Sequence, residues 1–149
     1  MPILTINCNA RLIDILNGDQ TGVVRPYLYP TTPKNKLERQ IYVSNQLIKD
    51  GFTPFIEVKF VSQYSAREKR IEIIGVNGNL IKFFQFTSRA SFDQDANELQ
   101  RLITEVSSIS ESKSFTLEGE IITLDDSTDI PLLQQTLHDM GLNIKLRYL

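Results

Sequence analysis

Hydrophobic and polar residues follow a strand-like pattern in three consecutive runs in the middle of the chain. The runs are Thr53–Ser62, Arg70–Val76 and Leu80–Thr87. Alternation with a period of two, together with many β-branched and aromatic residues, is typical of β-strands. Asn77-Gly78 separates the last two runs, and this dipeptide accepts the positive φ angles that a two-residue type I′ turn needs. The sequence therefore predicts three strands, the last two in a hairpin that pairs Val76 with Asn79.

Both faces of this predicted hairpin are largely apolar. One face carries Glu72, Ile74, Val76, Ile81, Phe83 and Gln85, and the other carries Ile71, Ile73, Leu80, Lys82, Phe84 and Phe86. An antiparallel sheet with one solvated face alternates more cleanly between apolar and polar residues. We therefore expect both faces to be covered, either by helices or by a partner subunit.

Amphipathic helices are predicted on both sides of the three strands. The first has Thr32 as its N-cap and Pro33 at its first position, and runs to Asp50, with an apolar stripe of Leu37, Ile41, Leu47 and Ile48. The second begins at a capping box formed by Ser91 and Gln94, and its apolar stripe is Ala96, Leu99, Leu102, Ile103 and Val106. Residues Ser107–Ser114 are serine-rich and are predicted to form a flexible connector.

The two ends of the chain add further elements. Ile3–Cys8 is predicted to be a strand, and Ala10–Asn17 fits either a short helix or a second strand. Toward the C-terminus the pattern predicts a strand, a helix that starts at Ile130 and a last strand; the two strands are Phe115–Leu124 and Leu142–Leu149. The whole chain, residues 1–149, is thus predicted to be a single α+β domain. Its antiparallel or mixed sheet has about five strands, with an αβββα core and a C-terminal βαβ unit.

Composition and charge limit the classes of function. The chain has 149 residues, a formal net charge of −2 and a single cysteine, so no intramolecular disulfide can form. A net acidic chain has no general attraction to nucleic acid, although a local basic patch can provide one. The N-terminus does not resemble a signal peptide and no run is long enough to span a membrane, so we expect a cytoplasmic protein without membrane association. No motif for a cofactor or a multi-cysteine metal site is present.

Glu57-Val58-Lys59 in the first strand, with Glu72 in the second, suggests one candidate catalytic site. The order αβββαβ is similar to the core of restriction-endonuclease-like proteins. The resemblance implies two carboxylates that hold Mg²⁺ and a lysine that stabilises the attacking water or the developing charge. The family pattern has an Asp on the second strand and Glu-x-Lys on the third, whereas here Glu-x-Lys lies on the first. The third strand offers only Lys82 and Gln85.

A basic segment between the first two strands suggests a binding site. Arg67, Lys69 and Arg70 lie close to Tyr64, and a basic loop beside an aromatic ring can contact RNA or an acidic protein surface. The αβββα order is also similar to that of double-stranded-RNA-binding domains, which carry a lysine cluster at the start of their second helix. At that place this chain has Arg89 followed by Asp93 and Asp95, which would repel phosphate.

These observations lead to two alternative functions. We expect a small, non-catalytic protein-interaction or adaptor domain that binds a protein partner or associates with itself as a homodimer. Its last strand would pair with another chain, with Lys145 and Arg147 either contacting the partner or guarding the edge. The alternative is a nucleic-acid-binding protein or a metal-dependent nuclease-like domain that uses Glu57, Lys59 and Glu72.

Overall fold

A computed structural model describes residues 10–22, 33, 35–62, 67–123 and 130–149 of the chain. It has four α-helices and five strands of a mixed sheet, and it confirms the predicted α+β class. The chain divides into two compact units, residues 1–78 and 79–149, each of which is described by itself. The predicted strand Ile3–Cys8 lies outside the described residues.

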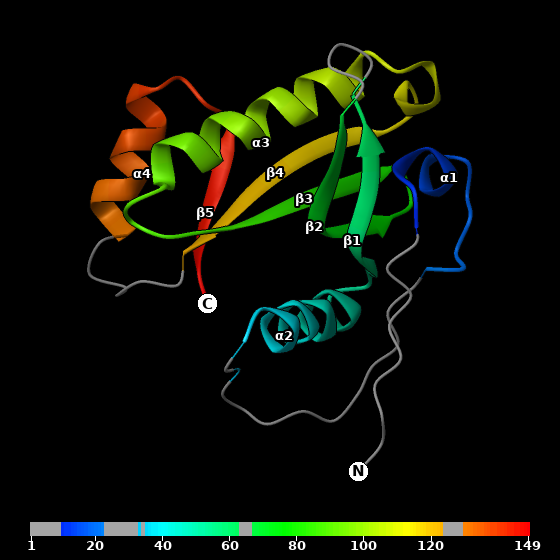
Figure 1. Ribbon diagram of the computed structural model, residues 1–149, viewed down its shortest axis with the longest axis horizontal. Coiled ribbons are helices and arrows are strands. Elements are labelled where there is room, and N and C mark those ends of the chain that lie inside the picture. The colour runs from blue at the N-terminus through cyan, green and yellow to red at the C-terminus, as the bar shows by residue number, and fades with distance from the viewer. Residues whose placement is uncertain (1–9, 23–32, 34, 63–66, 124–129) are drawn as a thin grey trace. The chain divides into compact units, whose positions relative to one another are not determined.

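The first unit is an antiparallel strand pair with a helix packed on it (Figure 1). It contains α1 (Leu12–Leu16), α2 (Lys36–Lys49), β1 (Thr53–Val61) and β2 (Glu68–Asn77). β1 and β2 pair from Thr53↔Val76 to Val61↔Glu68, and α2 contacts both strands. The core of the unit is formed by the buried side chains of Ile41, Val43, Leu47, Phe55, Ile56, Val58, Ile71, Ile73 and Ile74.

The start of α2 differs from the prediction. Asn35, not Thr32, is the N-cap, and its side chain accepts a hydrogen bond of 2.9 Å from the backbone N–H of Glu38. The first N–H groups of a helix have no partner within the helix, and the Asn35 side chain provides one for Glu38. The helix therefore begins at Lys36. Leu37 is 44% exposed and does not belong to the buried stripe, because it lies in this first turn. The predicted end of the helix is confirmed, since Gly51 follows it with a φ of 87°.

The turn after β2 also differs from the prediction. β2 ends at Asn77 and β3 (Leu80–Thr87) begins at Leu80, so Gly78 and Asn79 connect the two strands. Gly78 has a φ of 57°, whereas neither Asn77 nor Asn79 has a positive φ. Only the first central residue of the connection is therefore left-handed, which is typical of a type II′ turn with glycine in that position. The predicted type I′ turn at Asn77-Gly78 and the pairing of Val76 with Asn79 are wrong.

The second unit is a parallel three-stranded arrangement with two crossover helices (Figure 1). β3 pairs in parallel with β4 (Thr116–Thr123), and β4 pairs in parallel with β5 (Ile144–Tyr148). α3 (Phe92–Ser107) connects β3 to β4 and packs on both, and α4 (Ile130–Asp139) packs on β5. β4, α4 and β5 form the predicted C-terminal βαβ unit.

Two predicted features at the ends of α3 are wrong. Ser91 is the N-cap residue but makes no capping hydrogen bond; its hydroxyl donates to the Asp95 carboxylate at 2.8 Å. This carboxylate also accepts from the Thr87 hydroxyl at 2.8 Å, so side chains around Asp95 replace the capping box. The serine-rich segment after α3 is ordered, because it contains the short 3₁₀ helix η1 (Ser110–Ser112). Ser112 is buried there and donates to the carbonyl oxygens of Val106 and Ile109.

Candidate functional site

Glu57 lies in the middle of β1 with an unusual backbone conformation. Its φ is 49°, the only positive φ at a residue other than glycine in the described part of the chain. The register on both sides places Glu57 opposite Glu72, and this position alone is missing from the ladder of paired residues. Left-handed backbone at a non-glycine residue costs about 1–3 kcal/mol, and such residues cluster at functional sites. The strain at Glu57 therefore identifies this position as the first candidate for a site.

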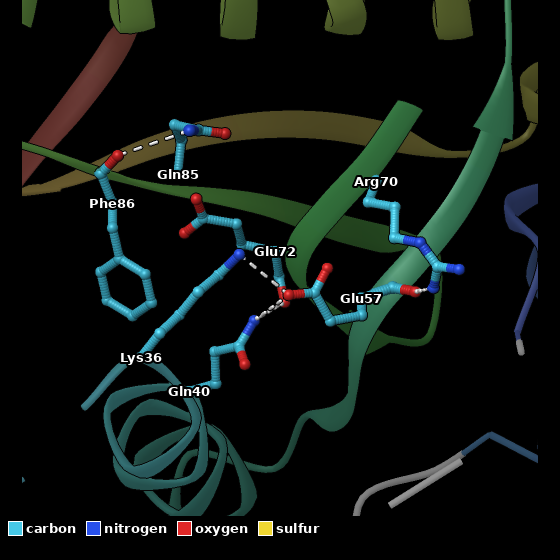
Figure 2. Close-up of polar contacts among 7 residues, drawn as sticks. All are labelled: Lys36, Gln40, Glu57, Arg70, Glu72, Gln85 and Phe86. Carbon is cyan, nitrogen blue, oxygen red and sulfur yellow. Dashed lines mark hydrogen bonds and ion pairs between the residues drawn. The ribbon is translucent and has the colours of Figure 1, made fainter. Parts of the chain in front are cut away.

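Two side chains from the first turns of α2 hold the Glu57 carboxylate (Figure 2). Lys36 Nζ lies 3.0 Å from Glu57 Oε1, and Gln40 Nε2 donates to the same oxygen at 3.2 Å. Lys36 and Gln40 are four residues apart on one helix, so they share a face. α2 therefore brings a cation and an amide donor to one carboxylate oxygen.

Gln40 also ties this carboxylate to β2. Its side-chain amide donates to the Glu72 carbonyl oxygen at 3.1 Å, and the residue is only 2% exposed. A buried amide that donates to two acceptors is fixed in position, because each lost hydrogen bond would leave a buried polar group unsatisfied. Gln40 thus links α2, β1 and β2 at the position where Glu57 and Glu72 face each other.

The charges around Lys36 favour its ammonium form. The hydrogen bond to Glu57 raises the pKa of Lys36 above its ordinary value, and the charges of Glu57 and Glu72 raise it further against the opposing effect of burial. The Lys36 side chain is 57% exposed and that of Glu57 is 20% exposed. The site is thus a partly shielded cation between two carboxylates, accessible from the side of the lysine.

A row of basic residues lies next to this site. Lys59 is the ladder partner of Arg70 in β2, and on its other side it forms an isolated bridge with Arg11. The Lys59 backbone N–H donates to the Ala10 carbonyl at 2.8 Å, which holds the segment before α1 against β1. Like charges directly opposite each other in a sheet are unfavourable. The row Arg11, Lys59 and Arg70 carries three cations, two of which have acidic neighbours. Arg11 pairs with the Asp14 carboxylate at 2.8 Å, and Arg70 lies 3.8 Å from the Glu68 carboxylate.

The structure brings together some of the predicted site residues and separates others. Glu57 and Glu72 occupy opposite places in the β1–β2 ladder, but the lysine that pairs with Glu57 is Lys36, not Lys59. Lys69 and Arg70 are residues of β2 and not of a loop, and Arg67 directly precedes that strand. Tyr64 lies outside the described residues.

Lys36, Gln40 and Arg11 are the residues that the sequence did not indicate. Their role depends on which strand residues are met by α2 and by the segment before α1, and the sequence around them contains little of this information. A weak signal exists at Gln40, a polar residue next to Ile41 on the apolar side of a helix. Buried polar residues are normally hydrogen-bonded to specific partners.

The two predicted binding residues of the last strand contact β4 within the second unit. Lys145 Nζ lies 3.9 Å from the Glu118 carboxylate, and Arg147 forms an ion pair with Glu120. The Arg147 guanidinium also lies 5.8 Å from the centroid of the Phe84 ring. In the same unit, the Gln85 amide donates to the Phe86 carbonyl at 3.4 Å (Figure 2).

A shallow cavity of about 410 Å³ lies between α4 and β5. Its lining residues are Gln134, Leu137, His138, Leu142, Ile144, Lys145 and Leu146. The lining combines the polar residues Gln134, His138 and Lys145 with aliphatic residues, of which Leu137 and Ile144 are buried.

Comparison with known proteins gives a fold and no activity. The crystal structure of AF1548, described as a protein of unknown function, matches with a TM-score of 0.53 and 15% sequence identity. The match covers 76% of this chain and 58% of that chain, so this chain corresponds to little more than half of its structural neighbour. No protein-family model matches the chain, and no curated protein matches its sequence. In the described part of the chain, no helix is long and apolar enough to cross a membrane.

Proposed function

We propose that this protein binds nucleic acid along β1 and β2 and cleaves a phosphodiester bond with the help of a divalent cation. The observation that carries the proposal is the strained Glu57, which faces Glu72 and is held by Lys36 and Gln40. The carboxylates would supply oxygen ligands to the cation, and the bound cation would polarise the phosphate and activate a water molecule.

Magnesium is the cation that two carboxylates alone would suit best. The described residues include no group of three His, Cys, Asp or Glu side chains that could hold a metal ion. Mg²⁺ keeps several waters and is commonly bound through one or two carboxylates together with substrate phosphates. Glu57 and Glu72 match this pattern, whereas the closed nitrogen and sulfur sites of zinc are not matched.

The basic row gives the substrate class. Arg11, Lys59 and Arg70 lie in register beside the carboxylates, and Lys69 and Arg67 add two exposed cations at the start of β2. Cations spaced along a strand pair suit the regular charges of a phosphate backbone, and such contacts give affinity without sequence preference. The proposed substrate is therefore a nucleic acid bound through its backbone.

Cleavage is tested with labelled DNA and RNA, single- and double-stranded, at low salt with Mg²⁺, with Mn²⁺ and with a chelator. We expect cation-dependent cleavage that falls at least about a hundredfold in Glu57→Gln and in Glu72→Gln, as for loss of a group that stabilises transition-state charge. Glu98→Gln, an exposed glutamate of α3, is the matched control and should keep full activity. Activity that persists in both site variants, or no cleavage of any substrate, would refute the catalytic part.

Binding is tested separately by its salt dependence. Each lost phosphate contact should lower the slope of log affinity against log salt by about one. We expect this change for Lys59→Ala and for Arg70→Ala, but not for Lys49→Ala at the exposed end of α2. Equal slopes in all three variants would show that the basic row Arg11, Lys59 and Arg70 does not contact the phosphate backbone of the nucleic acid.

The edge position of β5 supports a second candidate, the adaptor or self-association function. β5 pairs with β4 on one side and is last in the strand order, so its other edge can accept a strand from a partner. Size-exclusion chromatography with light scattering at two protein concentrations tests self-association. A dimer that Ile144→Pro converts to a monomer would support pairing through β5, whereas a monomer at both concentrations would exclude a homodimer.

A further inference from the structure

The cavity between α4 and β5 reaches an open edge of the sheet. It is lined by three consecutive residues of β5, Ile144, Lys145 and Leu146, and by residues of one face of α4. Successive side chains of a strand point to opposite faces, so a cavity that touches all three residues extends to the edge of the strand. In the described part of the chain, β5 is last in the strand order and no strand pairs with its outer edge.

The backbone groups of Ile144 and Leu146 face this outer edge. One residue after β5, the Leu149 N–H donates to the Thr123 carbonyl of β4 at 3.3 Å. Backbone groups of alternate residues in a strand point to the same side, so those of Lys145, four residues earlier, also face β4. The N–H and C=O groups of Ile144 and Leu146 therefore point away from β4, where an added strand can bond to them.

The side chains of β5 form an aliphatic face and a basic face. Ile144 and Leu146 line the cavity together with the buried Leu137 of α4. Lys145 alternates with them and points to the other face, where its Nζ lies 3.9 Å from the Glu118 carboxylate. The Lys145 side chain is 70% exposed, and an ion pair this long and exposed is weak. Its ammonium can therefore also pair with an anion of a partner.

We propose that the outer edge of β5 binds an extended segment of a partner protein in which an aliphatic residue is flanked by acidic residues. The segment adds to the sheet as a strand, and its aliphatic side chain enters the cavity on the α4 face. The neighbouring acidic side chains point to the opposite face and meet Lys145, since cross-strand neighbours on one face interact. The inference rests on the second candidate function, pairing through β5, and names the chemistry of the partner.

A second copy of this chain fits the edge less well. Two copies of β5 that pair about a two-fold axis run antiparallel and share the same two faces. Lys145 and Arg147 of one copy then lie opposite the same basic residues of the other. Like charges directly opposite each other are unfavourable, so charge favours an acidic segment of a different protein.

The test measures binding of fluorescent octapeptide pools to the full chain by anisotropy. The pools have Asp-Leu-Asp, Lys-Leu-Lys or Asp-Ser-Asp at their centre and mixtures of Thr, Ser and Gln elsewhere. We expect the Asp-Leu-Asp pool to bind at least about tenfold more tightly than either of the others. Lys145→Glu should reverse the preference between the aspartate and lysine pools that contain leucine. Lys113→Glu, the same change at an exposed residue after η1, should leave the preference unchanged.

A second pair of variants tests the cavity. Gln134 is an exposed residue of α4 that lines the cavity, so Gln134→Trp fills it without changing the core. We expect this variant to bind the Asp-Leu-Asp pool at least about tenfold more weakly than the wild type. Gln135→Trp, at the exposed neighbour outside the lining, should bind like the wild type. Circular dichroism shows whether each variant is folded.

The inference is overturned if no pool binds, if all pools bind equally, or if Lys145→Glu keeps the wild-type preference. Light scattering distinguishes this failure from that of self-association. A dimer that Ile144→Pro dissociates, without binding of any peptide, would support pairing of two copies and refute the acidic partner. A monomer that prefers the Asp-Leu-Asp pool would support the acidic partner and exclude the homodimer.

Discussion

Gln40→Leu gives the sharpest test of the site as a structural unit. The substitution keeps the approximate size of the side chain but removes the amide that donates to Glu57 Oε1 at 3.2 Å and to the Glu72 carbonyl at 3.1 Å. Loss of a hydrogen bond to a charged acceptor costs about 1.5–3 kcal/mol, and loss of one to a neutral acceptor about 0.5–1.5 kcal/mol. The more apolar leucine returns about 1 kcal/mol through its burial. We therefore expect a loss of about 2 kcal/mol in the free energy of unfolding.

Urea denaturation followed by circular dichroism measures this change. With a slope of about 2 kcal/mol per molar urea, the midpoint should fall by about 1 M. Gln94→Leu is the matched control, because Gln94 is exposed on α3 and its amide donates to Glu98 four residues away. The control should change stability by less than about 0.5 kcal/mol. A midpoint for Gln40→Leu within about 0.2 M of the wild type would refute the argument that this amide holds the two strands and the carboxylate together.

Three further predictions concern individual charges. The Glu57→Gly variant should be more stable than Glu57→Ala by about 1 kcal/mol, because only glycine relieves the positive φ. This order is the reverse of the usual one in a strand. Chemical denaturation of both variants shows which has the larger free energy of unfolding. Arg147→Ala should lower the free energy of unfolding by about 2–3 kcal/mol, because it leaves the Glu120 carboxylate, which is 9% exposed, without its ion pair. Lys145→Ala changes a side chain that is 70% exposed and should lower it by less than about 0.5 kcal/mol in the same assay. Because the folded pKa of Lys36 lies above its ordinary value of 10.5, its stabilising contribution is complete below that pH and is lost as the pH rises through the folded pKa. NMR titration of the Lys36 side chain should show this upward shift, and the shift should become smaller in Glu57→Gln.

The sequence by itself determined the class of fold and most of its elements. The periodicity of apolar residues indicated the three central strands and the two long helices, because each element must bury one face and repeats with its own period. Gly51 marked the end of α2, since a left-handed residue follows that helix. The doubly apolar strands were also evident, and Ile73 and Ile74 are both buried.

Local signals failed where several side chains compete for the same partner. Thr32-Pro33 is a reasonable helix start, but Asn35 provides the cap instead. Ser91 and Gln94 have the spacing of a capping box, yet the Ser91 hydroxyl donates to the Asp95 carboxylate. The same carboxylate also accepts a hydrogen bond from the Thr87 hydroxyl. In each case another polar side chain within eight residues offers an alternative hydrogen bond, and the sequence does not show which one forms.

Tertiary structure alone decided the composition of the candidate site. The pattern around Glu57-Val58-Lys59 placed the carboxylate beside Lys59, and it gave no reason to consider α2. Packing of that helix on β1 and β2 brings Lys36 and Gln40 to Glu57, and the positive φ of Glu57 interrupts the ladder at this position. The sequence thus determines which residues can be charged or buried, whereas long-range packing determines which of them meet.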